Sequence, residues 1–521
     1  MFNILNSIFI WNFEEMLYST ILKERSEIMK GFENFLNTLN GFMWGPVMLL
    51  LLVGTGIFMT CRTRGLQFRK FGLIMKETVG KMFTKTEVKE GSLSPVQAMT
   101  TALAGTVGTG NIAGVTGAIA LGGPGAVFWM WISALFGMCT KFTEVTLSVR
   151  YREKNDQGDW VGGPMYYIKN GMGKRWTWLG TLFALFAMIA AFGIGNMTQV
   201  NTIATSIGTI FTEFNPAMQQ HLKMIYLIIG IVIAILAALV LFGGLNRIGA
   251  TTEKLVPVMA IVYIVAALVV IFTHVPMLGS VFHDIFVGAF NPEAIGGGMA
   301  GTVIMTVMRA GIGRGVFSNE AGLGSAPIAH AAADTDHPIR QGFFGAFEVF
   351  ADTIVICTMT ALAVLVSGKA VGFYGKSAGT DLTISAFSTT FGGKIAAVII
   401  ATCIAMFAFS TVLSWALYGT RCAEFLFKTS KVIKPYQILF IIFIVVGATM
   451  KLSVAWTVAD TLNAMMAIPN LIAVLALSPE VIRLMKDFFS GHPKCTTDNL
   501  QSWAQEEGGI QNVSTRERAA E

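Results

Sequence analysis

The sequence is short of charge. Only 13% of its 521 residues are Asp, Glu, Lys or Arg, whereas 54% are hydrophobic. Soluble domains carry roughly 25% charged residues, so this composition excludes an ordinary soluble protein. No polar stretch is long enough for a sizeable soluble domain, and the apolar runs have about the 20 residues that a helix needs to cross a bilayer. We expect an all-α polytopic membrane protein with about eleven transmembrane helices.

The sequence also lacks the patterns that mark metal centres and disulfide frameworks. Its six cysteines form no C-x-x-C pair, and its six histidines show no metal-ligand spacing. Most cysteines lie in or beside apolar runs, where cysteine behaves as a small hydrophobic residue. The net charge of +6 comes from loops between spans, so it indicates topology and not nucleic-acid binding. We expect no cofactor.

A signal peptide is missing as well. The first apolar run is short, follows no basic residue and leads into NFEEM. The stretch beginning at Met29 reads as a natural start. We therefore interpret residues 1–39 as an N-terminal extension, of which 1–28 are additional to the native chain, and 491–521 as a polar cytoplasmic tail.

What the chain does contain is a regular series of apolar segments. They lie at 42–61, 94–121, 123–147, 177–211, 223–243, 254–273, 297–317, 342–367, 393–427, 436–450 and 453–477. We assign 40–490 to one transmembrane domain. Residues 40–93 form an extra span and an amphipathic loop, 94–273 a first repeat and 297–477 a second repeat.

Basic residues gather in alternate loops. The loop 62–93 carries eight Lys and Arg residues, whereas 274–296 carries none. Because cytoplasmic loops are enriched in Lys and Arg, this bias places the first loop and the C-terminus in the cytoplasm and the N-terminus outside. A count of eleven spans keeps the alternation intact.

Two glycine-rich stretches interrupt the apolar pattern. GTVGTGNIAG, 105–114, falls near the middle of the second segment, and GIGRGVFSNEAGLGS, 311–325, ends the seventh. Glycine costs about 1 kcal/mol against alanine in a helix. Unwound backbone is tolerated in a bilayer only where it is buried in protein or lines a cavity. We expect both helices to be broken, although close packing through small residues explains one such stretch equally well.

The positions of the two breaks indicate an inverted repeat. After the extra span, they fall in the first and sixth of the ten remaining helices. Because equivalent helices are five apart, an odd number, the second set runs inverted relative to the first. Interrupted helices at matching positions of inverted halves are the best sequence indication of a transporter's central site.

The same residues resemble a known family. GTGNIAGVTGAIALGGPGAVFWMW and RGVFSNEAGLGSAPIAHAAADTDHPIRQG are similar to signatures of the alanine/glycine:cation symporter family, within the amino acid–polyamine–cation superfamily. The likeness extends over nearly all of 40–490. It implies a sodium-coupled carrier, not an enzyme, that imports alanine and often glycine across a cell membrane. It also implies the inverted 5+5 fold of the neurotransmitter:sodium symporters and alternating access.

VGTGN, 107–111, also resembles the broken first helix of the neurotransmitter:sodium symporters. The resemblance implies that the amides of Thr109 and Gly110 hold the substrate carboxylate while Gly108 keeps the backbone open. Gly311 and Gly313, which open the second stretch, are expected to border the substrate.

The resemblance also implies two sodium sites. The Thr106 carbonyl and the Asn111 side chain would contact the ion beside the substrate. The residues it places at the second ion are Ala104, Val107, Phe407, Ser410 and Thr411. All-oxygen, largely neutral ligation suits a hard cation such as sodium.

Helical spacing adds further candidates. Phe192, Asn196 and Gln199 lie four and three residues apart, so we expect them on one face. Phe192 would cap a methyl pocket, and either amide would hydrogen-bond the substrate; polar packing between helices is an equal alternative for the amides. Trp415 either borders the pocket or packs in the core.

Ionisable residues within the apolar segments are costly and therefore functional candidates. Glu348 and Asp352 are four apart and share a helix face, so one of them would set the charge at the substrate-side sodium. The alternative is a structural pair with Arg309 or Arg314.

Other ionisable and polar residues are assigned structural roles. Lys141 and Glu144 are expected to pair with each other, and Asn319 and Glu320 to hold the second break together.

Three other functions are weighed against this interpretation. Ser325 and His330 suggest a hydrolase, but GLGSAPIAH is not the G-x-S-x-G elbow. A channel needs a continuous pore, whereas two inverted broken helices favour alternating access. A proton-coupled amino-acid carrier of the same fold remains the alternative, against which the hydroxyl pair Ser410–Thr411 favours sodium.

Overall fold

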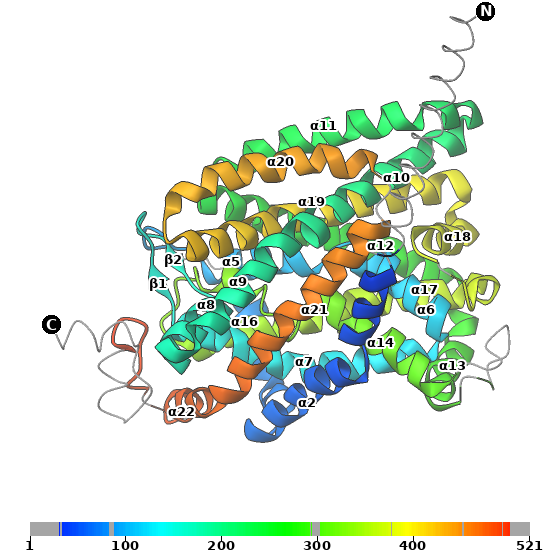
Figure 1. Ribbon diagram of the computed structural model, residues 1–521. Coiled ribbons are helices and arrows are strands. Elements are labelled where there is room, and N and C mark those ends of the chain that lie inside the picture. Colours follow the sequence, from blue (N-terminus) through cyan, green and yellow to red (C-terminus); the bar gives the residue numbers. More distant parts are fainter. Residues whose placement is uncertain are drawn as a thin grey trace, which may run out of the picture.

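The computed structural model describes residues 31, 34–82, 88–291, 293, 303–376, 378–450, 453–491 and 493–500. The expected extension 1–28, the start of segment 297–317 and most of the tail 491–521 lie outside these residues. The described chain is a bundle of long helices with one short antiparallel hairpin, β1 (Glu153–Lys154) and β2 (Trp160–Val161), at one end (Figure 1).

The extra span is α2 (Pro46–Arg62), which packs against α7 (Gly125–Arg150). The loop after it folds into the short helices α3 (Leu66–Arg69) and α4 (Phe71–Thr78) and the turn η1 (Val79–Lys81). α4 lies against α16 (Pro338–Val349), so the expected amphipathic loop is folded onto the second repeat.

The first repeat begins with a well-capped helix. Ser94 accepts the amide of Gln97 at 3.0 Å and Gln97 accepts the amide of Ser94 at 3.1 Å, a reciprocal cap that fixes where the helix starts. Besides α7 and the hairpin, the repeat contains α5 (Pro95–Thr106), η2 (Gly110–Gly114), α6 (Val115–Gly122), α8 (Pro164–Tyr167), η3 (Ile168–Met172), η4 (Lys174–Trp176), α9 (Thr177–Phe192), η5 (Gly193–Met197), α10 (Thr198–Phe214), η6 (Pro216–His221), α11 (Leu222–Leu241) and α12 (Gly244–Thr273).

The second repeat follows η7 (Val275–Met277) and α13 (Leu278–Phe290). Besides α16, it contains α14 (Ile304–Asn319), α15 (Pro327–His330), η9 (Phe350–Cys357), α17 (Thr358–Val366), η10 (Lys369–Phe373), α18 (Thr380–Phe391), α19 (Gly393–Phe427), η11 (Ser430–Val432), α20 (Ile433–Thr449) and α21 (Ser453–Ala476). The surface helix α22 (Ser478–Phe488) comes last.

The expected number of spans is confirmed. Nine helices of the described chain are long and apolar enough to cross a membrane, and the two interrupted helices complete the eleven. In the core, α7 packs against α14 and α16, while α19 packs against α5, α9 and α10. Segments from both repeats therefore surround the two interruptions.

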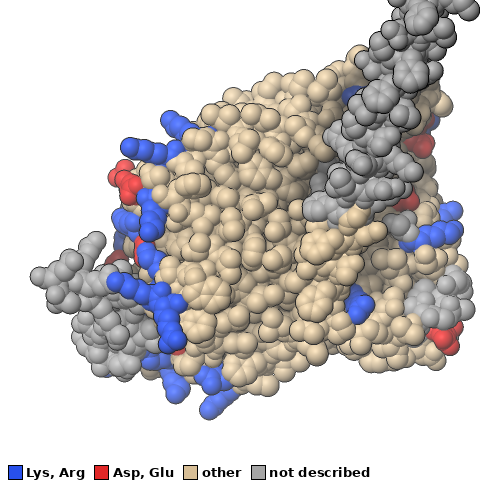
Figure 2. Space-filling view, in the orientation of Figure 1, with Lys and Arg blue, Asp and Glu red and all other residues tan. Residues whose placement is uncertain are grey.

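Charge is distributed unevenly over the surface. Figure 2 shows Lys and Arg gathered at the end that carries the hairpin and α22, next to a broad face with few charged residues. The helices also expose apolar side chains, among them Leu227, Ile231 and Ile235 of α11. Such a surface is suited to lipid, as expected of a multi-pass membrane protein.

Candidate functional site

The first interruption lies between α5 and η2. α5 ends at Thr106, and Val107 and Gly108 leave the helical path before the π-helical turn η2 begins. The side chain of Asn111 stabilises this turn, because its Oδ1 accepts the amide of Gly108 at 2.9 Å. The interruption occurs where the glycine pattern predicts it.

α19 covers this interruption with hydroxyl groups. Ser410 Oγ lies 3.2 Å from the Ala104 carbonyl oxygen, and both Ser410 and Thr411 donate to the Phe407 carbonyl, at 2.8 and 3.0 Å. A Cβ on Gly108 would lie only 2.6 Å from Thr411 Oγ1. Four of the groups expected at the second sodium, the Ala104 and Phe407 carbonyls and the Ser410 and Thr411 hydroxyls, are thus neighbours. The Thr106 hydroxyl bonds within its own helix.

A fully buried carboxylate joins the two interrupted helices. Asp352 accepts hydrogen bonds from Asn111 Nδ2 at 2.7 Å, from Ser318 Oγ at 2.9 Å and from Thr353 Oγ1 at 2.7 Å. Asn111 belongs to the first interrupted helix and Ser318 to the last turn of α14 before the second. No Lys, Arg or His of the described chain forms an ion pair with Asp352. A carboxylate buried without a counterion is costly, so this position favours a bound cation or a proton.

Glu348, one helical turn earlier, has a different environment. Lys141 Nζ lies 3.3 Å from one of its oxygens, and His330 Nε2 lies 3.0 Å from the other. The alternative partners Arg309 and Arg314 form no ion pair with Glu348 in the described chain, and Lys141 forms its ion pair with Glu348 and not with the expected Glu144. Glu144 instead accepts a hydrogen bond from Asn470. Packing of α7 against α16 brings Lys141 to Glu348. This contact cannot be predicted from the spacing of the residues in the sequence.

The second interruption falls later in the chain than the glycines suggest. α14 remains helical to Asn319, and the break spans Glu320 to Ala326, beginning with Glu320 in the left-handed region at φ 54°. Gly311 and Gly313 therefore lie within the helix and not at the break, which corrects the expected position of the second interruption. Gly311 serves close packing instead, because a Cβ there would meet the backbone of Ala126.

Side chains at the second interruption form hydrogen bonds with one another and with neighbouring segments. Asn319 accepts the amide of Ala321 at 3.0 Å and donates to Thr353 at 3.0 Å. Glu320 accepts hydrogen bonds from Ser325 and, at 3.1 Å, from the indole of Trp415. Ser325 bonds to Glu320 and His330 to Glu348, so the two do not form a nucleophile–base pair.

The three candidates around η5 do not share one face. Gln199 Oε1 accepts the Thr109 hydroxyl at 3.1 Å, so Gln199 reaches the first interruption. Asn196 instead donates to the Phe440 carbonyl at 2.7 Å, and the Phe192 ring packs on Tyr436, Phe440 and Phe443 of α20. The π-helical turn of η5 changes the angular spacing, which corrects the expectation drawn from regular helical periodicity.

A small cavity opens over the first interruption. Its volume is about 210 Å³, below the range of drug-sized ligand pockets, roughly 300–1,000 Å³. A Cβ on Gly110 would lie 3.5 Å from the Phe317 ring, so this aromatic side chain stands against the interruption. The lining residues are Thr109, Gly110, Ala113, Gly114, Gly117, Thr202, Arg314, Phe317, Ala378 and Gly379.

Sequence reasoning missed Ser318, Thr353 and Phe317. The first two adjoin residues already selected, Asn319 and Asp352, so their proximity along the chain was an available signal. Phe317 had no such signal, because its position depends on how α14 crosses η2.

Comparisons with known proteins are consistent with this geometry. A profile described as the sodium:alanine symporter family matches residues 29–501. The sodium/alanine symporter AgcS of Methanococcus maripaludis is 45% identical over 463 residues, covering 88% of this chain and 97% of the relative.

Two Bacillus subtilis relatives are more distant. The probable sodium/glutamine symporter GlnT is 37% identical over 457 residues, covering 88% of this chain and 90% of GlnT. The putative sodium/proton-dependent alanine carrier protein YrbD is 34% identical over 471 residues, covering 87% of this chain and 92% of YrbD.

Among solved structures, MhsT in complex with L-phenylalanine shares the fold with a TM-score of 0.51 and 14% identity. The match covers 76% of this chain and 99% of that chain.

Proposed function

Because the chain belongs to the sodium:alanine symporter family, we propose that it imports small neutral amino acids, alanine and also glycine, by sodium-coupled alternating access. The chain is a multi-pass membrane protein and its relatives are transporters, not enzymes. The observation that carries the proposal is Asp352, a buried carboxylate that has no counterion among the described residues and lies at the junction of both interrupted helices.

The substrate would bind at the first interruption. Amides at Thr109 and Gly110, next to the positive end of a half-helix, suit an amino-acid carboxylate. The Thr109 hydroxyl and Gln199 add polar groups on one side, and Phe317 limits the space on the other. A cavity of about 210 Å³ favours a short side chain over a bulky one.

Sodium would bind where oxygens converge. One ion beside Asn111 and Asp352 would neutralise the buried carboxylate and connect α14 to the first interrupted helix. A second would lie among the carbonyls of Ala104 and Phe407 and the hydroxyls of α19. Sodium moving inward down a membrane potential contributes about 2.3 kcal/mol per charge per 100 mV, which drives uptake.

The distribution of Lys and Arg indicates how the protein is oriented in the membrane. Lys and Arg gather at the end that carries the hairpin and α22 (Figure 2). We place this end in the cytoplasm and the N-terminus outside. The cavity over the first interruption, lined by Ala378 and Gly379 from the opposite end, would then be the outer approach to the site.

The second candidate is proton coupling with the same fold. Asp352 favours it as well, because a proton neutralises a buried carboxylate as effectively as a metal ion. The Ser410–Thr411 pair beside the Ala104 carbonyl favours sodium, since these neutral oxygens can hold a hard cation but cannot carry a proton through the cycle.

The test is uptake of labelled L-alanine into proteoliposomes under an inward sodium gradient, compared with inward potassium and inward proton gradients. Each is run with and without a tenfold excess of glycine, serine or leucine. Uptake that requires sodium and is blocked by glycine but not by leucine is the expected result. Uptake that ignores sodium and follows the proton gradient would overturn the proposal in favour of the second candidate.

A further inference from the structure

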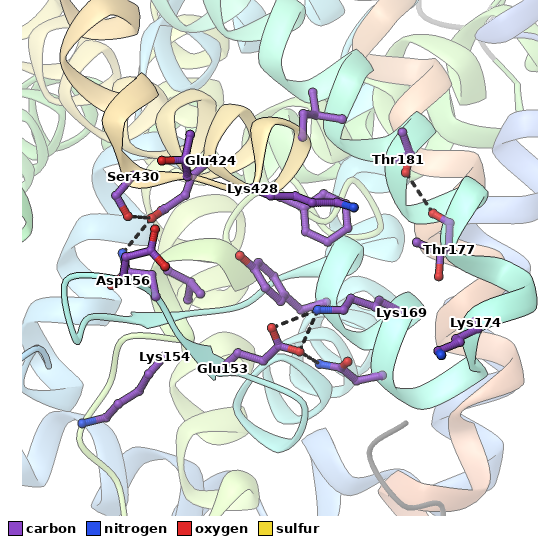
Figure 3. Close-up of a pocket in the computed structure, with 17 residues that line it drawn as sticks. Glu153, Lys154, Asp156, Lys169, Lys174, Thr177, Thr181, Glu424, Lys428 and Ser430 are labelled. Carbon is purple, nitrogen blue, oxygen red and sulfur yellow. Dashed lines mark hydrogen bonds and ion pairs between the residues drawn. The ribbon is translucent and has the colours of Figure 1, made fainter. Parts of the chain in front are cut away.

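A large cavity lies at the basic end of the molecule, apart from the site described above. Its volume is about 640 Å³, and it is enclosed by the hairpin, the start of α9 and the end of α19 (Figure 3). Its charged lining residues are Lys154, Lys169, Lys174, Lys428, Glu153, Asp156 and Glu424.

Two of the three carboxylates already have basic partners. Glu153 pairs with Lys169 Nζ at 3.0 Å, as Figure 3 shows. Glu424 shares Arg421 with Asp159, at 2.8 and 2.7 Å, and accepts hydrogen bonds from Asn155 at 2.8 Å and Ser430 at 2.5 Å. With four lysines against three carboxylates, the lining of the cavity carries a net positive charge.

The cations are better placed for a ligand than the carboxylates. Lys428 and Lys154 have no ion pair in the described chain; Lys154 lies only over the Trp160 ring, at 5.3 Å. Lys174 faces the cavity from the turn that leads into α9. Together these groups favour an anion.

The cavity lies where two transmembrane spans meet the membrane surface. The span Lys174–Phe214 begins here, and the span Gly393–Phe427 ends here. Trp178 is 56% exposed and Phe427 61% exposed, and Trp176 stacks on Trp178. Exposed tryptophans at the ends of spans lie at the level of lipid headgroups.

An apolar track leads away from the cavity. Leu185 and Ile189, seven and eleven residues after Trp178, are also exposed and continue the same face of α9. A ligand with an anionic head and acyl chains fits both parts, whereas a soluble anion would use only the lysines. We propose that this cavity binds the phosphate-bearing headgroup of an anionic phospholipid, whose chains lie along α9.

The test is thermal unfolding of the full-length, detergent-purified protein with added short-chain phosphatidylglycerol or phosphatidylcholine. Phosphatidylglycerol should raise the transition temperature of the unmodified protein, and phosphatidylcholine should not. The Lys174→Gln/Lys428→Gln variant should need about 30-fold more phosphatidylglycerol for the same rise, because each basic residue near an anionic headgroup contributes about fivefold.

The matched control is Lys76→Gln/Lys486→Gln, which removes two exposed lysines that do not line the cavity. It should respond like the unmodified protein. Equal weakening in both double variants, or an unchanged response in the cavity variant, would overturn the proposal. An equal rise with soluble glycerol phosphate would also overturn it, in favour of a soluble anion. If the double variant does not fold, Lys428→Gln alone provides the same test with an effect of about fivefold.

Discussion

The two interrupted helices differ in how their non-helical backbone is stabilised. At the first interruption Asn111 accepts the amide of Gly108, Thr360 donates to the Asn111 carbonyl at 2.7 Å, and the backbone borders a cavity. At the second, Asn319, Glu320, Ser325 and Trp415 bond to one another or to their neighbours and fill the break. The first interruption therefore has space beside it for a ligand, whereas the second is filled by its own side chains. Asp352 belongs to both, because it bonds a residue of each interrupted helix.

Glu348→Gln should produce the largest loss of stability. The variant leaves Lys141 buried without its counterion, which costs about 3–5 kcal/mol. We expect a markedly lower unfolding temperature in detergent, while the protein that remains folded keeps the sodium dependence of alanine uptake. An unchanged unfolding temperature together with altered sodium dependence would instead place Glu348 in the ion site. It would contradict the structural role assigned to Glu348 here.

Gly108→Val should abolish substrate binding without removing the protein from the membrane. A Cβ at this position would lie 2.6 Å from Thr411 Oγ1, so α19 and the interruption must separate. We expect uptake to fall about 100-fold, as displacements of about 1 Å at a site do. The matched control is Gly54→Val on the exposed side of α2, where a Cβ would meet nothing within 4 Å. Normal uptake by well-expressed Gly108→Val protein would contradict the assignment of the first interruption.

Trp415→Phe should have the smallest effect. It removes the indole donor to Glu320 and leaves most of the buried ring, at a cost of about 1.5 kcal/mol for a hydrogen bond to a charged group. We expect a slightly lower unfolding temperature and an unchanged apparent affinity for alanine. A large drop in affinity at constant stability would show that Trp415 borders the substrate.

Much of the fold could be predicted because it depends on local pattern. Apolar runs located the spans, and glycine beside polar residues located the break at Val107 and Gly108. The second break was placed too early, because Gly311 packs against α7 and Gly313, which has open space beside it, lies within the same unbroken helix. Small residues have the same appearance in sequence whether they loosen a helix or bring two helices together.

The candidate site was less predictable because its contacts cross the chain. Lys141 and Glu348 meet only through the packing of α7 on α16. The π-helical turn at η5 directs Asn196 away from Gln199. Regular α-helical spacing does not predict this change of direction. The neighbours of Asp352 come from three separate segments, so sequence identified the carboxylate but not its lack of a counterion.

The most direct test of this account is equilibrium binding of labelled L-alanine to the purified protein across a series of sodium concentrations, compared between the unmodified protein and Asp352→Asn. The amide has nearly the shape of the carboxylate but no charge to attract a cation. We predict that the unmodified protein binds alanine only with sodium, and that binding by Asp352→Asn no longer changes with sodium. An Asp352→Asn variant with the same sodium dependence as the unmodified protein would contradict the assignment of Asp352 to the coupling cation.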